Sequence, residues 1–175
     1  TIKPLVIEIK KSIWRVERII KATLLFTKNV QINPSSFYLD KFIKECEKAI
    51  EHYSYTKEVS FHFELPHLEI KGDFELLNLV LQNFIFNAID AIEESDNETG
   101  TIILSYQEDK EFVVLHVKDD GKPIENKNIL FEPFKTTKTK GNGLGLALSL
   151  QIIQAHNGKI ELLEETKGFS IKIAR

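Results

Sequence analysis

The stretch DFELLNLVLQNFIFNAIDAIEE, residues 73–94, decides the fold of this chain. Its apolar residues recur at steps of three and four, the spacing of an amphipathic helix, and they are Phe74, Leu77, Leu81, Phe84, Ala88 and Ala91. Apolar residues also fill most of the remaining positions, which is typical of a helix that is buried on nearly all sides. We therefore expect a core helix that opens at Gly72-Asp73 and ends near Glu94.

A second line of residues on this helix is polar. Asn83, Asn87 and Asp90 are separated by steps of four and three, so they share one face. A buried amide without a partner costs about 1–3 kcal/mol. These side chains therefore either bond to nearby backbone groups or line a ligand cavity, where an amide oxygen can help to coordinate a hard cation such as Mg²⁺. The pattern alone leaves both possibilities open.

Helix and strand patterns lie on both sides of this stretch. Further helices are expected at residues 3–28, 40–52 and 144–156, and strands at 37–39, 59–65, 68–70, 101–108, 111–118, 159–163 and 168–173. Asp40 is the expected N-cap of the second helix, and strand 68–70 is the expected partner of strand 59–65. Residues 121–143 are expected to be irregular, apart from a short turn at 128–131. Because this order does not repeat a strand–helix unit, it favours an α+β two-layer sandwich over a doubly wound parallel sheet.

The first helix has a coiled-coil seam, formed by Val6, Ile9, Ile13, Val16 and Ile20. Such a helix either lies on the core of its own domain or associates with other helices, and the length of the seam favours association. The Asn33-Pro34 break then divides the chain into residues 1–32 and a domain of residues 33–175.

Composition narrows the class of protein. The 175 residues include 23 Lys and Arg against 26 Asp and Glu, a net charge of −3 that argues against nucleic acid as the main partner. The single cysteine, Cys46, allows no internal disulfide and fits a reducing compartment. No apolar run approaches the ~18–20 residues that span a bilayer. Since the chain begins at Thr1 and contains no methionine, we expect it to be part of a longer protein.

Asp119-Asp120-Gly121 follows the alternating strand that contains Val113, Leu115 and Val117. A carboxylate and a glycine at a strand end are typical of an ordinary turn. Beside a cavity, the carboxylate could instead accept a hydrogen bond from the exocyclic amine of a base, while Gly121 lets the ring approach the backbone.

Three alternate glycines, Gly141, Gly143 and Gly145, lead directly into the helix expected at 144–156. Backbone N–H groups at a helix start bind phosphate oxygens well. Additional donors precede them at Thr136, Thr137, Lys138 and Lys140. The alternative is a solvated loop before a helix. Residue 146 is Leu, so the Rossmann fingerprint is incomplete, and the chain contains no P-loop motif.

Taken in order, these motifs resemble the ATP-binding domain of bacterial sensor histidine kinases, in the superfamily of gyrase, Hsp90 and MutL. The resemblance covers essentially the whole chain. It implies a Bergerat-type ATP-binding fold, in which a mixed sheet of about five strands packs on three helices, preceded here by one long helix. That first helix resembles the second helix of the family's dimerisation and histidine-phosphotransfer hairpin.

The resemblance also implies site residues. Residues 81–88 are similar to the N box, in which Asn87 would ligate Mg²⁺ and Asn83 would support it, and Asp119 would bind the adenine amino group. The catalytic residues would be Asn83, Asn87, Thr137 and Lys138. The nucleotide-binding residues would be Asn83, Asn87, Asp119, Gly121, Ile124, Phe131, Phe134, Thr136, Thr137, Lys138, Gly141, Asn142, Gly143, Leu144, Gly145 and Leu146.

The implied function is that of a cytoplasmic two-component sensor kinase. The γ-phosphoryl group of ATP would pass to a histidine upstream of Thr1, and then to an aspartate of a response-regulator receiver domain. We expect a homodimer in the full-length protein, no nucleic-acid partner, and no membrane contact by this part of the chain.

Two positions depart from the family pattern: Pro123 replaces a glycine of the G1 box, and Asp90 replaces a frequent phosphate-binding lysine. Because of these two departures, a degenerate nucleotide-binding scaffold without phosphotransfer is an alternative function. A serine-directed kinase of the same superfamily is another. An ATP hydrolase is disfavoured, because Asn83 occupies the position at which hydrolases of this superfamily carry a glutamate base.

Overall fold

The computed structural model describes residues 2–53, 55–135 and 143–175. The helices are α1 (Ile2–Thr27), α2 (Leu39–His52), α3 (Phe74–Glu93) and α4 (Gly145–Ala155), with a short 3₁₀ turn η1 (Lys127–Ile129). The strands are β1 (Ser35–Tyr38), β2 (Glu58–Glu64), β3 (Glu69–Gly72), β4 (Thr99–Glu108), β5 (Phe112–Asp119), β6 (Lys159–Leu162) and β7 (Gly168–Ala174).

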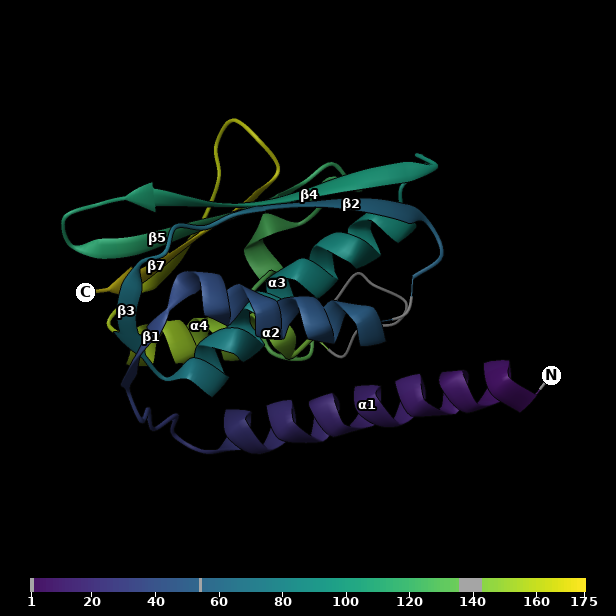
Figure 1. The fold of residues 1–175 in the computed structure, drawn as a ribbon, viewed down its shortest axis with the longest axis horizontal. Coiled ribbons are helices and arrows are strands. Elements are labelled where there is room, and N and C mark those ends of the chain that lie inside the picture. The colour runs from purple at the N-terminus through teal and green to yellow at the C-terminus, as the bar shows by residue number, and fades with distance from the viewer. Residues whose placement is uncertain (1, 54, 136–142) are drawn as a thin grey trace.

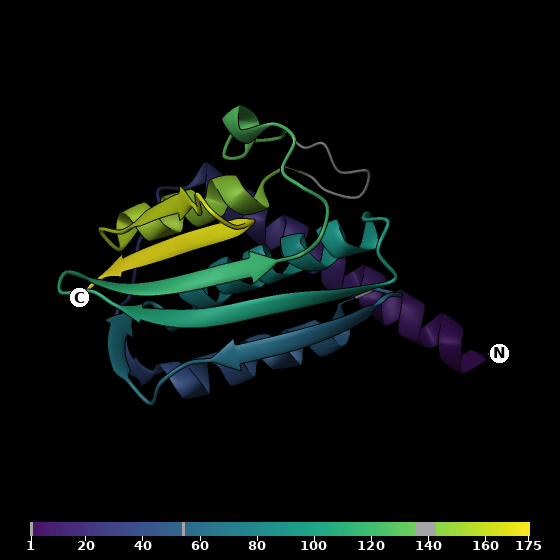
Figure 2. The same ribbon diagram turned by 90° about the horizontal axis from the view of Figure 1, so that it is seen from above.

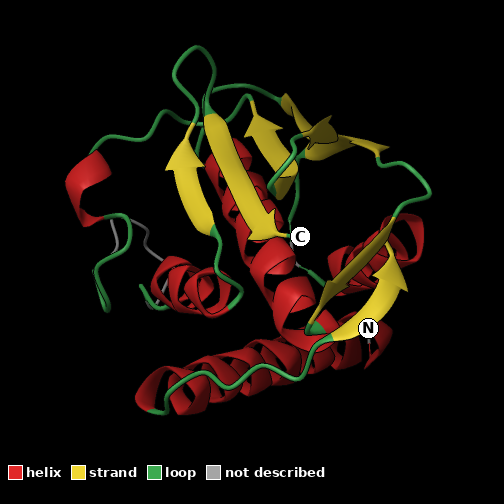
Figure 3. Cartoon of the chain, turned by 90° about the vertical axis from the view of Figure 1, so that its left-hand side faces the viewer, coloured by secondary structure: helices red, strands yellow, loops and turns green. Residues whose placement is uncertain are grey.

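The main sheet has five strands in the order β2-β4-β5-β7-β6. Strand β2 runs parallel to β4, and the remaining pairs are antiparallel. Helices α2, α3 and α4 cover one face of this sheet, and α1 runs beneath them as a further layer (Figures 1 and 3). The expected α+β sandwich, with a mixed five-stranded sheet, three helices and a preceding long helix, is confirmed.

One expected strand pair is wrong. Strand β3 pairs antiparallel with β1, with Phe37 opposite Ile70, and these two strands form a separate small sheet. The backbone N–H of Leu39 bonds to the carbonyl oxygen of Leu68 at 3.0 Å, which holds the segment before β3 against the start of α2. Strand β2 instead pairs with β4, which is distant in sequence, because a strand with one apolar face gains more by joining the main sheet over the core.

Helix α3 lies in the centre of the core, and Ile85, Ile89 and Ile92 are fully buried. The helix begins where the sequence predicts, directly after Asp73, whose Oδ1 caps it by accepting a 3.1 Å hydrogen bond from the backbone N–H of Leu76.

The expected N-cap of the second helix is wrong. Helix α2 begins one residue earlier, its N-cap is Tyr38, and that residue makes no side-chain cap hydrogen bond. The carboxylate of Asp40 instead contacts the ring of His67 at 2.9 Å. The ring of His67 also stacks on Tyr38, so local aromatic contact organises this helix start in place of a cap.

Helix α1 presents its coiled-coil seam to solvent. The five seam residues, from Val6 to Ile20, are between 43% and 55% exposed. The face turned towards the domain carries Arg18, Ala22 and Leu25, which the helical repeat places opposite the seam. Helix α1 therefore contacts the domain with one face and leaves the other apolar face uncovered. The N-terminal end of α1 projects past the rest of the molecule (Figures 1 and 2).

None of the helices within the described ranges is long and apolar enough to cross a bilayer.

Candidate functional site

The two asparagines of α3 lie one turn apart and differ in burial. Asn83 is 6% exposed, whereas Asn87 is half-buried. The Nδ2 group of Asn83 donates to the carbonyl oxygen of Gly145 at 3.0 Å and to Oγ of Ser149 at 3.1 Å. Asn83 therefore fastens the middle of α3 to the first turn of α4.

The carboxamide oxygen of Asn83 has its own partner. Nη2 of Arg18, from α1, donates a hydrogen bond to Oδ1 of Asn83. The Arg18 guanidinium also lies 4.4 Å from the centre of the Phe86 ring. Burial lowers the pKa of Arg18 to about 10, partly offset by the nearby Tyr53 and Asp90, so the side chain stays cationic at neutral pH.

Asp90, at the position where the family often has a lysine, accepts a 2.7 Å hydrogen bond from the Tyr53 hydroxyl. The Tyr53 ring stacks on Phe86 with 4.1 Å between centroids. Burial, and then the adjacent Asp90, raise the pKa of Tyr53, so its hydroxyl remains a donor. Asp90 thus belongs to a polar cluster between α2, α3 and α1.

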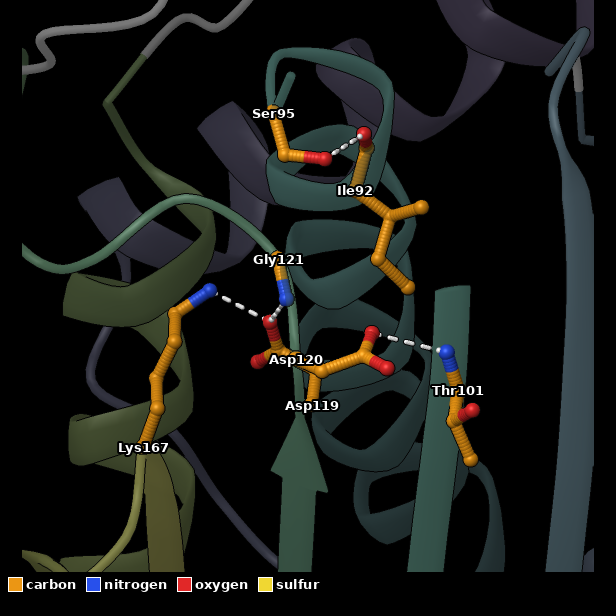
Figure 4. Close-up of polar contacts among 7 residues, drawn as sticks. All are labelled: Ile92, Ser95, Thr101, Asp119, Asp120, Gly121 and Lys167. Atoms are coloured by element: carbon orange, nitrogen blue, oxygen red, sulfur yellow. Dashed lines mark hydrogen bonds and ion pairs between the residues drawn. The ribbon is translucent and has the colours of Figure 1, made fainter. Parts of the chain in front are cut away.

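Asp119 ends β5, and its side chain is only 7% exposed. Its Oδ1 accepts a 2.9 Å hydrogen bond from the Gly121 backbone N–H and forms an ion pair with Nζ of Lys167, which comes from the loop between β6 and β7 (Figure 4). Burial raises the pKa of Asp119, and the Lys167 ammonium opposes that shift. Asp120, the neighbouring carboxylate, instead accepts a 2.8 Å bond from the backbone of Thr101 (Figure 4).

Gly121 packs directly against the backbone of α3. A Cβ at this position would lie 2.5 Å from the carbonyl carbon of Ala91 and 2.5 Å from the nitrogen of Ile92. The next N–H, of Lys122, donates to the Ala91 carbonyl at 2.8 Å. Close packing against the core helix therefore explains the need for a glycine at position 121. The sequence alone suggested a different reason, the approach of a base ring to this backbone.

The glycine-rich segment is described from Gly143 onward. Gly143 has a φ of +69°, in the left-handed region that favours glycine, and its carbonyl accepts a 3.1 Å bond from the N–H of Phe134. Helix α4 begins at Gly145, one residue later than expected, and Leu144 at its N-cap position is buried. Five expected site residues lie outside the described residues: Thr136, Thr137, Lys138, Gly141 and Asn142.

The remaining expected site residues are apolar. Phe131 packs edge-on against Phe169 at 6.4 Å between centroids, whereas Phe134 is 68% exposed and contacts Phe26 of α1, also at 6.4 Å. Ile124 and Leu146 are half-buried.

Four residues that sequence reasoning missed contact the polar side chains described above: Arg18, Tyr53, Ser149 and Lys167. Only Ser149 carried a usable signal. It stands four residues after Gly145, so both face the same side of α4, and its hydroxyl also bonds to the Gly145 carbonyl at 2.8 Å. The other three approach from segments far away in sequence.

No group of three or more His, Cys, Asp or Glu side chains comes together as a metal site in the described part of the chain. Mg²⁺ commonly takes most of its ligands from nucleotide phosphates and water, and an amide oxygen such as that of Asn87 can supply one more. The half-buried amide of Asn87 fits that limited role.

Comparison with known proteins adds independent information. Residues 72–174 match the family model described as histidine kinase-, DNA gyrase B-, and HSP90-like ATPase. Over 173 residues the chain is 50% identical to the sensor histidine kinase FlgS of Helicobacter pylori. The aligned region covers 98% of this chain and 45% of FlgS. The chain thus spans less than half the length of this relative.

Solved structures agree with the sequence matches. The histidine kinase AdeS of Acinetobacter baumannii superposes with a TM-score of 0.71 at 25% identity, covering 91% of this chain and 76% of AdeS. The histidine kinase ThkA, solved in complex with the response regulator protein TrrA, superposes with a TM-score of 0.68 at 27% identity, covering 99% of this chain and 51% of ThkA. The match to ThkA extends over nearly the whole chain and therefore includes α1.

Proposed function

Because the chain belongs to the family of histidine kinase-, DNA gyrase B- and HSP90-like ATPases, we propose that it is the ATP-binding catalytic part of a two-component sensor histidine kinase. The reaction would transfer the γ-phosphoryl group of ATP to a histidine nitrogen supplied by another segment of the protein, and from there to a response-regulator aspartate.

One observation carries this proposal: two candidate motifs converge on nine residues of α3. At Asn83 the helix bonds to the first turn of α4, and at Ala91 it bonds to the loop that follows Asp119. Asn87 lies midway, about 6 Å along the helix axis from each. A phosphate-binding helix start, a metal-binding amide and a base-binding carboxylate would thus adjoin one another along a single rigid element.

The proposed roles follow from the chemistry of each group. Asp119 would accept a hydrogen bond from the adenine amino group, and Lys167 beside it opposes protonation of the carboxylate. The N–H groups at the start of α4 would bind phosphate oxygens. Mg²⁺, held through Asn87, would neutralise phosphate charge. Thr137 and Lys138 would contact the γ-phosphate, so the chain would act by positioning and electrostatics.

We further propose that residues 1–32 are the second helix of the dimerisation and phosphotransfer hairpin. The exposed seam of α1 supports this, since an apolar face of this length gains stability by packing on other helices. The partners would be the preceding hairpin helix, a second copy of the protein, and a response regulator such as the one solved with ThkA. The bacterial relatives and the single buried cysteine, Cys46, support a bacterial, cytoplasmic setting.

Calorimetric titration with Mg-ATP tests the binding site. Asn87→Ala and Asp119→Asn should each weaken binding by about tenfold or more, the equivalent of one lost interaction of ~1.4 kcal/mol. Asn97→Ala, at an exposed turn, is the matched control and should bind like the wild type. Failure of the wild type to bind would favour the degenerate scaffold, and unchanged binding by Asn87→Ala would refute the metal assignment.

Phosphotransfer needs a longer polypeptide. The chain joined to the segment that precedes it in the natural protein should form an acid-labile phosphohistidine from ATP, and Asn87→Ala should abolish the product. Absence of the product despite tight Mg-ATP binding would count against the kinase assignment.

A further inference from the structure

One basic side chain of α1 is more buried than the basic side chains next to it. Arg18 is half-buried on the face that meets the domain, next to the buried Ala22, whereas Arg15 and Lys21 are exposed. A long charged side chain loses hydration and rotamer freedom when it is held in one place, so its position needs compensating contacts.

Those contacts come from one cluster. Arg18 donates to Oδ1 of Asn83 and lies over the ring of Phe86 at 4.4 Å, near enough to a desolvated aromatic face for a favourable cation–π interaction. The carboxylate of Asp90, held by the Tyr53 hydroxyl at 2.7 Å, supplies negative charge close to the guanidinium. The cluster thus forms a receptor for the guanidinium of Arg18, which donates to an acceptor and lies over an aromatic ring at the same time.

The receptor includes the amide that fastens α3 to α4. Oδ1 of Asn83 is held by Arg18, while Nδ2 is held by the Gly145 carbonyl and the Ser149 hydroxyl. The amide can be rotated by half a turn only if both sets of bonds are broken. Arg18 of α1 and the acceptors of α4 therefore stabilise the same orientation of the Asn83 amide from opposite sides.

We propose that Arg18 is a positioning residue that couples the docking of α1 to nucleotide binding. By holding the oxygen of Asn83, it keeps the amide nitrogen on the first turn of α4. The local coupling depends on the observed contacts alone, whereas its effect on the nucleotide rests on the function proposed above, in which that turn binds phosphate. Docked α1 and bound nucleotide then favour each other.

Removal of the guanidinium would leave the buried oxygen of Asn83 without the donor that Arg18 provides. Rotation of the amide would move the oxygen away from this site, but it would also turn the NH₂ group away from Gly145 and Ser149 and break both of its hydrogen bonds. The first turn of α4 would then be tethered less firmly to α3, and α1 would lose its charged anchor on the domain.

Amide hydrogen exchange on the nucleotide-free chain tests the local coupling. Arg18→Ala and Arg18→Gln should accelerate exchange in α1 and at the first turn of α4 by about tenfold, the equivalent of ~1.4 kcal/mol. Arg15→Ala is the matched control: it removes the same charge one turn away, from an exposed side chain, and should leave both regions unchanged. Equal exchange in the Arg18 variants and the wild type would overturn the proposal.

Titration with Mg-ATP then tests the coupling to the nucleotide. Arg18→Ala should bind about tenfold more weakly than the wild type, and Arg15→Ala within about twofold of it. In a double-mutant cycle, Arg18→Ala should add no further loss to Asn83→Ala, because both act through one amide. Equal or tighter binding by Arg18→Ala would overturn the coupling, whereas a wild type that does not bind would refute the proposed function and the coupling together.

Discussion

At the scale of single residues, the candidate base-binding carboxylate is half of a nearly buried ion pair. The side chains of Asp119 and Lys167 are 7% and 18% exposed, and Gly121 donates to the same carboxylate oxygen. The other oxygen is the one left for the amino group of a base in the proposed function. Lys167 therefore influences both the charge of Asp119 and the oxygen that would bind the base.

Lys167→Met should lower the free energy of unfolding by about 1–3 kcal/mol at pH 7, because a buried carboxylate loses its charged donor. Burial raises the pKa of Asp119 in the folded state, so the charged carboxylate costs stability at neutral pH, and that cost disappears as the pH falls through the folded-state pKa. The deficit should therefore shrink on acidification, as urea denaturation between pH 7 and ~4 would show. Lys172→Met, which removes a lysine from the more exposed pair with Glu161, should cost less, and a deficit independent of pH would contradict this account.

Two glycines, Gly121 and Gly145, differ in how much room each leaves for a side chain. Gly121→Ala should destabilise the protein by about 1–3 kcal/mol, because the new Cβ would collide with the backbone of Ala91 and Ile92 at 2.5 Å. Gly145→Ala should be tolerated, since its Cβ would meet the Asn83 side chain at 3.5 Å, an ordinary contact. Thermal unfolding of both variants checks this, and similar losses for the two would mean that the loop after Asp119 can move away from α3.

At the scale of elements, α3 organises the molecule. Its N-cap residue joins three segments: Oδ1 of Asp73 caps the helix, Oδ2 accepts from the Asn33 backbone at 2.9 Å, and the Asp73 N–H donates to Nε2 of His156 at 2.9 Å. The other ring nitrogen of His156 bonds to the Ile152 carbonyl at 2.8 Å, so this buried histidine is structural. One residue thus fixes the start of α3, the end of α4 and the chain that leaves α1.

Asp73→Ala should lower the free energy of unfolding by about 1–2 kcal/mol, the usual cost of losing a cap, and Asp73→Asn should recover most of it because asparagine also caps well. Asp40→Ala is the matched control. It lies in the first turn of α2 but not at the N-cap position, and its partner His67 is exposed, so little change is expected. Denaturation by urea measures all three, and an Asp40 effect as large as that of Asp73 would refute the distinction.

At the scale of the whole molecule, α1 forms a layer of its own beneath the sandwich (Figure 3). It touches the domain through Arg18, Ala22 and the edge-on contact of Phe26 with Phe134. Its opposite, apolar face is open to solvent along most of its length. In the proposed function, this apolar stripe would be the surface on which other helices pack.

The wild-type chain should self-associate with increasing concentration, and Ile13→Lys should suppress this, because a lysine in the seam places a charge in an apolar contact. Ile103→Lys, which changes an exposed residue of the sheet in the same way, should leave association unchanged. Sedimentation velocity compares the three chains. A wild type that remains monomeric at high concentration would contradict this prediction.

The sequence by itself determined the local structure and the identity of the candidate motifs. Helix periodicity and the alternation of β5 are encoded by neighbouring residues, so each described element formed within a few residues of its predicted bounds. The order of the motifs along the chain was also sufficient to indicate the family.

Tertiary structure alone decided the strand partner of β3 and the partners of the site residues. Arg18 bonds to Asn83 across 65 residues of sequence, and Lys167 pairs with Asp119 across 48. Neither contact produces a periodic pattern in the sequence. Each joins one polar side chain to another on a different element, and the packing of the two elements decides which side chains meet. Local patterns record which face a residue occupies, whereas the residue that stands opposite depends on how the layers come together.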